Sequence, residues 1–331
     1  MLLIGSLSML FAEVFSGASL LWFIDPWSIL ITFPLYLSHV LFFLNLAMRF
    51  HRTSFESLYL WGILFGLYET WITKVIWSGF GDGLILGQIF GIAIGEFIIL
   101  CLFWHPIMSF ITPILVFEIF SISQGNNHQK LLPSHEKLIT KNKNNQVLAW
   151  LIVLYGASFL SLNSHYNIIV ALVTALGSLM IVILLYYACK KYCDGFTIYE
   201  LKLGFKGFIT LIVYLIFLYA MLFFLIYPEK IPSLTTIFLT ILIYLIVIML
   251  IYLSKPQFKK KDWDTEIKYT AKDVWKLLLT FVFITAVFCL IPIIGFMIAT
   301  FLFVLIIPLG LTFFFFVLLN IIRHYLIRRQ Q

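Results

Sequence analysis

Long apolar runs fill this sequence and constrain its fold more than any other feature. A helix needs about 20 mostly apolar residues to cross the hydrocarbon core of a bilayer. With 62% hydrophobic and only 11% charged residues, little of the chain could form a soluble core. We therefore expect an all-α polytopic integral membrane protein with about ten transmembrane helices. The expected spans are 2–23, 27–48, 58–78, 84–104, 147–163, 166–188, 207–227, 232–254, 274–292 and 296–322.

Two segments need separate interpretation. The N-terminus has no basic region and carries Glu13 inside its apolar stretch, which indicates a retained first span and not a signal peptide. The stretch 105–120 contains Pro106 and Pro113. It could prolong the fourth span at a tilt, lie along the membrane interface, or form a short re-entrant piece broken at the prolines.

The basic residues predict the orientation of the spans. With the N-terminus inside, all but two of the 22 lysines and arginines fall on the cytosolic side, the exceptions being Lys74 and Lys230. Because cytosolic loops carry such an excess, we expect both termini in the cytosol. Cys189 and Cys193 then lie in a reducing compartment, so we expect neither a disulfide framework nor a metal site there.

Polar residues divide the chain into unequal halves. The segment 1–120 is expected to be a four-helix membrane bundle with ionisable residues near the midplane. The polar segment 121–146 reads as a cytosolic linker loop. The segment 147–331 reads as an apolar six-helix half with no charged side chain at membrane depth, which suits a scaffold or a partner surface.

Four ionisable residues of the first half fall at similar depths in the expected spans. At 1.5 Å rise per residue, each would lie roughly 16 Å from a membrane surface, near the midplane. Charged groups at that depth are costly, so four ionisable groups on successive helices at one depth are hard to explain as lipid-facing accidents. We therefore predict that ion or substrate binding involves Glu13, His39, Glu69 and Glu96, with Lys74 as a nearby countercharge.

Small residues recur beside these groups at helical spacing. Gly62, Gly66, Glu69 and Thr73 form one stripe, and glycines recur at every fourth position from Gly87 to Gly95. Such faces let helices approach closely, so the glutamates should point into a bundle. The alternative is that the stripes serve packing alone and that the glutamates are inert hydrogen-bonding groups.

The run Gly79-Phe80-Gly81-Asp82 resembles the GxGD signature of intramembrane aspartyl proteases. The resemblance implies that Asp82 and a second aspartate, here Asp25, share a proton and activate water. It covers four residues, and the following residues depart from the family pattern. Since Asp25 precedes Pro26 and glycines flank Asp82, turns between spans are the favoured interpretation.

Glu69, His105 and Glu118 also resemble, in part, the glutamate and histidine motifs of CAAX-type membrane proteases. The Glu-Glu pair, the arginine and the final His-x3-Asn are missing. In addition, His105 is expected about 15 Å or more from Glu69. No nucleotide fingerprint or phosphate loop occurs, so no cofactor is expected.

The favoured function is transport of a small solute or ion, coupled to protons or cations. A membrane-embedded enzyme and an assembly subunit are the alternatives. Expected partners are the lipid bilayer, anionic headgroups at basic loops such as 255–268, and a further copy or membrane protein, but not nucleic acid. The expected location is the cell membrane of a prokaryote.

Overall fold

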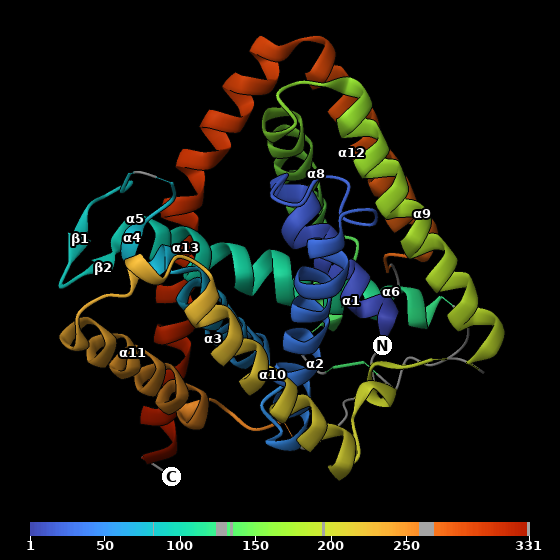
Figure 1. Cartoon of the computed structure of the whole chain (residues 1–331). Helices are drawn as coiled ribbons and strands as arrows, with labels where there is room; N and C mark the ends of the chain where they lie inside the picture. Colours follow the sequence, from blue (N-terminus) through green and yellow to red (C-terminus); the bar gives the residue numbers. More distant parts are fainter. Residues whose placement is uncertain (82, 124–130, 133–134, 194–195, 258–267, 330–331) are drawn as a thin grey trace. The chain divides into compact units, whose positions relative to one another are not determined.

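The computed structural model describes residues 1–81, 83–123, 131–132, 135–193, 196–257 and 268–329. Helices account for most of them, and the short strands β1 and β2 pair as one antiparallel hairpin (Figure 1). Apolar runs with i→i−4 bonding satisfy their own backbone, which is why helices suit lipid. The elements are α1 (Leu2–Met9), η1 (Leu10–Val14), η2 (Ser28–Thr32), α2 (Phe33–Arg49), α3 (Phe55–Thr73), α4 (Val75–Ser78), β1 (Gln88–Ile89), β2 (Ile92–Ala93), α5 (Ile94–Glu96), η3 (Phe97–Ile111), α6 (Thr112–Ile122), α7 (Glu136–Ile139), α8 (Lys143–Asn163), α9 (Ile168–Tyr192), η5 (Ile198–Leu201), α10 (Phe205–Leu225), η6 (Pro228–Lys230), α11 (Leu234–Leu253), α12 (Ala271–Leu290) and α13 (Pro292–Arg329).

Within the described residues, eight helices are long and apolar enough to cross a membrane. These helices agree with the expectation of an all-α polytopic membrane protein. The eight are Ser28–Arg49, Ile94–Ile122, Lys143–Asn163, Ile168–Tyr192, Phe205–Leu225, Leu234–Leu253, Ala271–Leu290 and Pro292–Leu326.

Two expected spans are not among the eight. The first, expected at 2–23, is a shorter apolar helix, Leu2–Val14, followed by turns. The third corresponds to α3, which has 19 residues but carries Glu56 and Glu69. These two carboxylates lower the mean hydropathy of an otherwise apolar helix.

The fourth span was predicted with the wrong bounds. Residues 84–93 form an extended hairpin, and the helix runs from Ile94 to Ile122. Gly87 and Gly91 have φ of 76° and 79°, which no helix accommodates. The helix continues through Pro106 and Pro113, so the interpretation of a short piece broken at the prolines is wrong, and a tilted span and an interfacial helix stay predictions.

By packing, the chain divides into two compact units. Unit 1 comprises Met1–Leu41, Thr112–Lys202 and Lys259–Val304, and unit 2 comprises Phe42–Ile111, Leu203–Phe258 and Leu305–Gln331. These units do not follow the boundaries expected near residues 120 and 147. The functional contrast between a polar and an apolar half stays a prediction.

In unit 1, α12 packs against α8 and α9, and α1 packs against α6 and α9. The Phe15 ring stacks on Phe281 at 4.3 Å between ring centroids. Gly156 also lies against this ring, and a Cβ added there would lie 2.3 Å from a ring carbon of Phe15. The glycine therefore makes room for an aromatic side chain at the centre of this unit.

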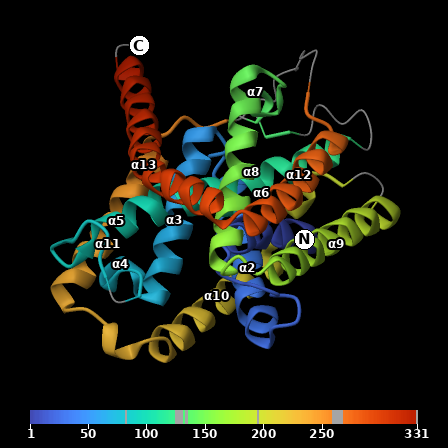
Figure 2. The same cartoon turned by 90° about the horizontal axis from the view of Figure 1, so that it is seen from above.

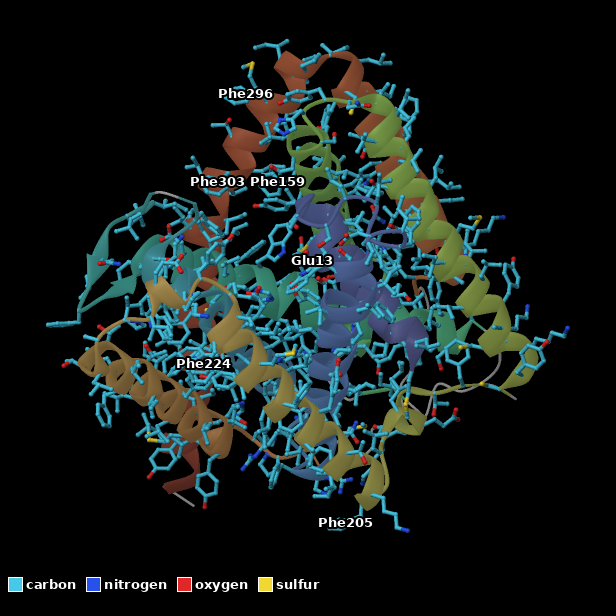
Figure 3. The ribbon with its side chains drawn as sticks, viewed as in Figure 1. Glu13, Phe159, Phe205, Phe224, Phe296 and Phe303 are labelled. Atoms are coloured by element: carbon cyan, nitrogen blue, oxygen red, sulfur yellow. The ribbon has the colours of Figure 1, made fainter. Side chains whose placement is uncertain are left out.

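In unit 2, α3 packs along η3, with α10 and α11 also against α3. The hairpin projects from unit 2 beyond α4 and α5, as Figures 1 and 2 both show. Phe205 and Phe224, near the two ends of α10, are exposed and are labelled in Figure 3. Such exposed aromatic and aliphatic side chains suit contact with lipid.

Candidate functional site

Two glycines bring α3 and η3 close together in unit 2. A Cβ added to Gly62 would lie 2.4 Å from the Pro106 Cα. One added to Gly66 would lie 3.0 Å from the Cys101 Cα and 3.1 Å from the His105 Cβ. The glycine stripe predicted on α3 therefore faces another helix at short range, as small residues allow.

A chain of three polar side chains occupies this contact. The carboxylate Oε2 of Glu69, on α3, lies 3.1 Å from Nε2 of His105, on η3. The other imidazole nitrogen, Nδ1, lies 3.1 Å from the Ser109 Oγ, one turn further along η3. Both nitrogens of the ring are thus occupied, which holds its orientation.

The exposed fraction of these three side chains decreases from Glu69 to Ser109. The Glu69 side chain is 18% exposed, that of His105 is 3% exposed, and Ser109 is fully buried. The Phe65 ring stacks on the imidazole at 5.4 Å between centroids. The carboxylate is therefore the accessible end of a hydrogen-bonded chain that leads into the protein.

The three hydrogen-bonded side chains Glu69, His105 and Ser109 can hold their protons in two arrangements. With Glu69 ionised, His105 Nε2–H donates to the carboxylate and Nδ1 accepts from Ser109. With Glu69 protonated, the carboxyl donates to Nε2, and Nδ1–H donates to the serine hydroxyl. In the second arrangement, transfer of the carboxyl proton to Nε2 leaves a carboxylate and an imidazolium whose Nδ1–H still donates to Ser109, without any change in the heavy-atom contacts.

The partnership of Glu69 with His105 was not expected from the sequence, and the predicted separation of about 15 Å or more is wrong, since the two side chains are in contact. The expected fourth span began at residue 84, whereas the helix begins at Ile94. His105 is therefore well inside the helix and opposite Glu69. The spacing of His105 and Ser109, four residues apart, was the available signal.

Glu96 is fully buried in the first turn of the helix that continues as η3. Its Oε1 accepts a hydrogen bond of 3.1 Å from the backbone N–H of Ile85. Its Oε2 has no hydrogen-bond partner among the residues that the structure describes. Glu96 thus fixes the base of the hairpin and lies in the first turn of a helix, and not in the middle of a helix spanning 84–104 as predicted; its membrane depth stays a prediction.

Lys74 is fully buried where α3 ends, in a left-handed conformation with φ of 60°. Its ammonium donates to the carbonyls of Phe223 and Ile226 and lies 4.8 Å from the centre of the Phe223 ring. Those carbonyls end helix α10, where a cation is favoured by the helix dipole. This geometry makes Lys74 a cap for α10, and its bonds go to carbonyls and not to a carboxylate.

Glu13 and His39 belong to unit 1. Glu13, labelled in Figure 3, accepts hydrogen bonds of 2.5 Å from Tyr36 and from Ser19. The buried His39 lies with Nδ1 2.7 Å from the Leu35 carbonyl of its own helix. Since η1 ends at Val14, Glu13 lies near the end of this helix and not in the middle of a span at 2–23, and its membrane depth stays a prediction.

The structure assigns the five predicted residues to two units. Unit 1 contains Glu13 and His39, and unit 2 contains Glu69, Lys74 and Glu96. In unit 2, the hydrogen bonds of the three charged groups go to an imidazole, to helix-end carbonyls and to a hairpin N–H, respectively.

A second carboxylate–imidazole pair lies in unit 1. One carboxylate oxygen of Glu118, on α6, contacts His135 Nδ1. The other oxygen accepts a hydrogen bond of 2.7 Å from the backbone N–H of Leu132. Both side chains are essentially buried. The pair fastens the segment before α7 onto α6.

Asp25 acts as a helix cap in unit 1. Its Oδ2 accepts from the Ser28 N–H at 2.8 Å and from the Ser28 hydroxyl at 2.6 Å, just before the helix that begins at Pro26. These hydrogen bonds hold the pKa of Asp25 below its ordinary value. Asp82, its proposed partner in a protease, lies outside the described residues. So does most of the basic loop expected to meet anionic lipid.

Clusters of three or more His, Cys, Asp or Glu side chains that could hold a metal ion do not occur in the described parts of the chain. The chemistry available on α3 and η3 is therefore that of a carboxyl group, an imidazole and a hydroxyl. These groups donate, accept and exchange protons, and a carboxylate can also bind a cation.

Fold and site together define a multi-pass helical membrane protein with buried ionisable groups in its helix contacts. The chain belongs to an uncharacterized membrane protein family, whose family model matches residues 2–329. It is also 38% identical over 138 residues to an uncharacterized protein of Archaeoglobus fulgidus. That match covers 41% of this chain and 44% of the relative, so the relative is matched over less than half of its length. No solved structure matches the chain.

Proposed function

We propose that this protein transports a small solute or ion across the cell membrane of a prokaryote, coupled to protons or cations. The observation that carries the proposal is the chain Glu69–His105–Ser109, with its accessible carboxylate and buried imidazole. Burial of an ionisable pair is costly unless its members bond to each other. Because of this cost, ionisable groups inside membrane proteins are rare and commonly mark ion or proton pathways.

The remaining predicted residues take supporting roles in this proposal. Glu96, with one carboxylate oxygen unbonded within the described residues, is a second position for a proton or cation. Glu13 and His39 supply a further acidic and a further basic group in unit 1. Lys74 contributes through the stability of α10 and not through contact with the transported species.

The test uses protons as the probe. Purified protein is reconstituted into liposomes containing the pH dye pyranine, and internal pH is followed after gradients of Na⁺, K⁺, Mg²⁺ or phosphate are imposed. We expect gradient-dependent proton flux above that of empty liposomes, and its loss in Glu69→Gln and His105→Gln. Glu56→Gln is the matched control, because this carboxylate lies on the same helix in its first turn and contacts Asn320. If Glu69→Gln conducts as well as the parent protein, the proposal is wrong.

A second candidate follows from the order of the same three groups. Serine, histidine and carboxylate in hydrogen-bonded sequence is the arrangement of a hydrolase with a serine nucleophile. Here, however, the serine is the fully buried member and the carboxylate is the accessible one. Labelling of Ser109 by a fluorophosphonate, abolished in Ser109→Ala, would favour the hydrolase over transport.

A further inference from the structure

The hairpin at residues 84–93 displays an unusual amount of apolar surface. Leu86, Ile89 and Phe90 are 54%, 57% and 80% exposed. The segment contains no charged residue, and the amide of Gln88, its one polar side chain, donates to the Trp77 carbonyl. In water, these side chains would lose the stabilisation that burial gives to large apolar groups.

The tip of the hairpin adds a second observation. Ile89 pairs with Ile92, so Phe90 and Gly91 form a two-residue connection. Their φ values are 50° and 79°, as a type I′ turn requires. That turn favours Asn, Asp or Gly, so a phenylalanine at the first position is strained as well as exposed.

The base of the hairpin is firmly attached. Ile85 donates its N–H to the buried Glu96 carboxylate, and its side chain lies against Gly95. Near the tip, the Phe90 carbonyl lies 3.4 Å from the Thr236 Oγ1 in the first turn of α11. These contacts hold the apolar tip in one position, so its exposure is a fixed feature of unit 2.

The neighbouring surface indicates what covers the tip. Thr236 is flanked on α11 by Leu234 and Phe238, which are 74% and 71% exposed. Helix α11 is one of the eight helices long and apolar enough to cross a membrane, and such surface belongs in lipid. The apolar face of the hairpin continues this surface at the beginning of α11.

We propose that residues 84–93 form a membrane-inserted hairpin, with Phe90 among the lipid acyl chains beside the first turn of α11. In that setting an exposed phenylalanine is favourable, and the transfer of its ring into lipid offsets the strained turn. The hairpin N–H and C=O groups not paired between the strands would lie towards the interface, where water can reach them. This proposal does not depend on the transport proposal.

The experiment places an environment-sensitive fluorophore at single cysteines in proteoliposomes. Cys189 and Cys193 are first replaced by serine, since Cys101 and Cys289 are buried. The label is attached in Phe90→Cys, in Phe238→Cys as the lipid-facing reference, and in Glu229→Cys as the aqueous reference from the loop before α11. Phosphatidylcholine with brominated acyl chains quenches from the lipid side, and iodide quenches from water.

We expect the label at Phe90 to be quenched by brominated lipid as strongly as that at Phe238, and to resist iodide. The label at Glu229 should show the opposite pattern. Ile89→Cys repeats the measurement if the Phe90 variant does not fold as a monodisperse protein. A label at position 90 that behaves like that at 229 would overturn the proposal. So would protection from both quenchers together with thiol cross-links between copies, which would indicate a second copy as the partner.

Discussion

Replacing Gly62 by alanine should damage the Glu69–His105 contact without touching either residue. The new Cβ would lie 2.4 Å from the Pro106 Cα, whereas ordinary contacts begin at 3.4 Å. Since Pro106 presents backbone atoms and not a flexible side chain, α3 must move away from η3 by about 1 Å. Overpacking of this kind costs about 1–3 kcal/mol of the free energy of unfolding.

The same displacement has a functional consequence. If α3 moves as a rigid body, the 3.1 Å contact between Glu69 and His105 lengthens by about 1 Å and is no longer a hydrogen bond. Gly62→Ala should therefore unfold at lower SDS fraction in mixed micelles and show reduced proton flux in liposomes.

Gly207→Ala is the matched control for this prediction. It also lies in a helix, but its added Cβ would meet only the Leu203 side chain, at an ordinary 3.5 Å. By helix propensity alone it should be neutral or gain up to about 1 kcal/mol. Equal stability and equal flux in the two variants would refute the reasoning that close approach of α3 and η3 builds the site.

Three further predictions concern residues outside that contact. Lys74→Met should lower the free energy of unfolding by about 2 kcal/mol, because two helix-end carbonyls lose their donor. Lys74→Arg should have a smaller effect on stability. In both variants, proton flux per folded molecule should be unchanged. Asp25→Ala should lower the melting temperature at neutral pH, because the helix loses its cap. Since the pKa of Asp25 is lowered in the folded state, the contribution of this carboxylate to stability is present above pH 3.8 and disappears as pH falls through the lowered pKa. Asp25→Asn should keep the cap without this pH dependence. Glu118→Gln or His135→Gln alone should cost about 3–5 kcal/mol, and replacing both by apolar residues should recover much of it, in the same SDS titration.

The fold class was predictable because the physics that decides it is simple. Apolar runs of about 20 residues have one stable solution in lipid, and α8 to α12 appear close to where the runs predicted them. The first and third spans were harder to predict, because an apolar stretch of about 20 residues need not be one continuous crossing helix. Turns after Val14 and the glutamates within α3 set those helices apart.

The choice of Glu69 as a candidate followed from its apolar surroundings, but its partner could not be predicted. Hydrogen-bond partners on different helices depend on the register between the helices, and register depends on where each helix begins. The glycines at 87 and 91 determine that beginning, since their positive φ turns the preceding segment into a hairpin and delays the helix to Ile94. From the sequence alone, Gly87, Gly91 and Gly95 were interpreted as a stripe on a helix. Their spacing of four residues fits a helical stripe and does not reveal that Gly87 and Gly91 belong to a hairpin.

That ambiguity also explains why the role of Glu96 changed. On a helix from 84 to 104 it would lie in the middle, as a charge near the membrane centre. On a helix from Ile94 it lies in the first turn, where the helix dipole favours a carboxylate and where it bonds to the hairpin N–H. A residue with the same neighbours in sequence thus lies at the start of a helix and anchors a hairpin, in addition to the proton or cation binding proposed for it. If Glu96→Gln keeps the Ile85 hydrogen bond, as an amide oxygen can, then the fluorescence of the label at position 90 should not change. Glu96→Ala should release the hairpin and expose that label to iodide.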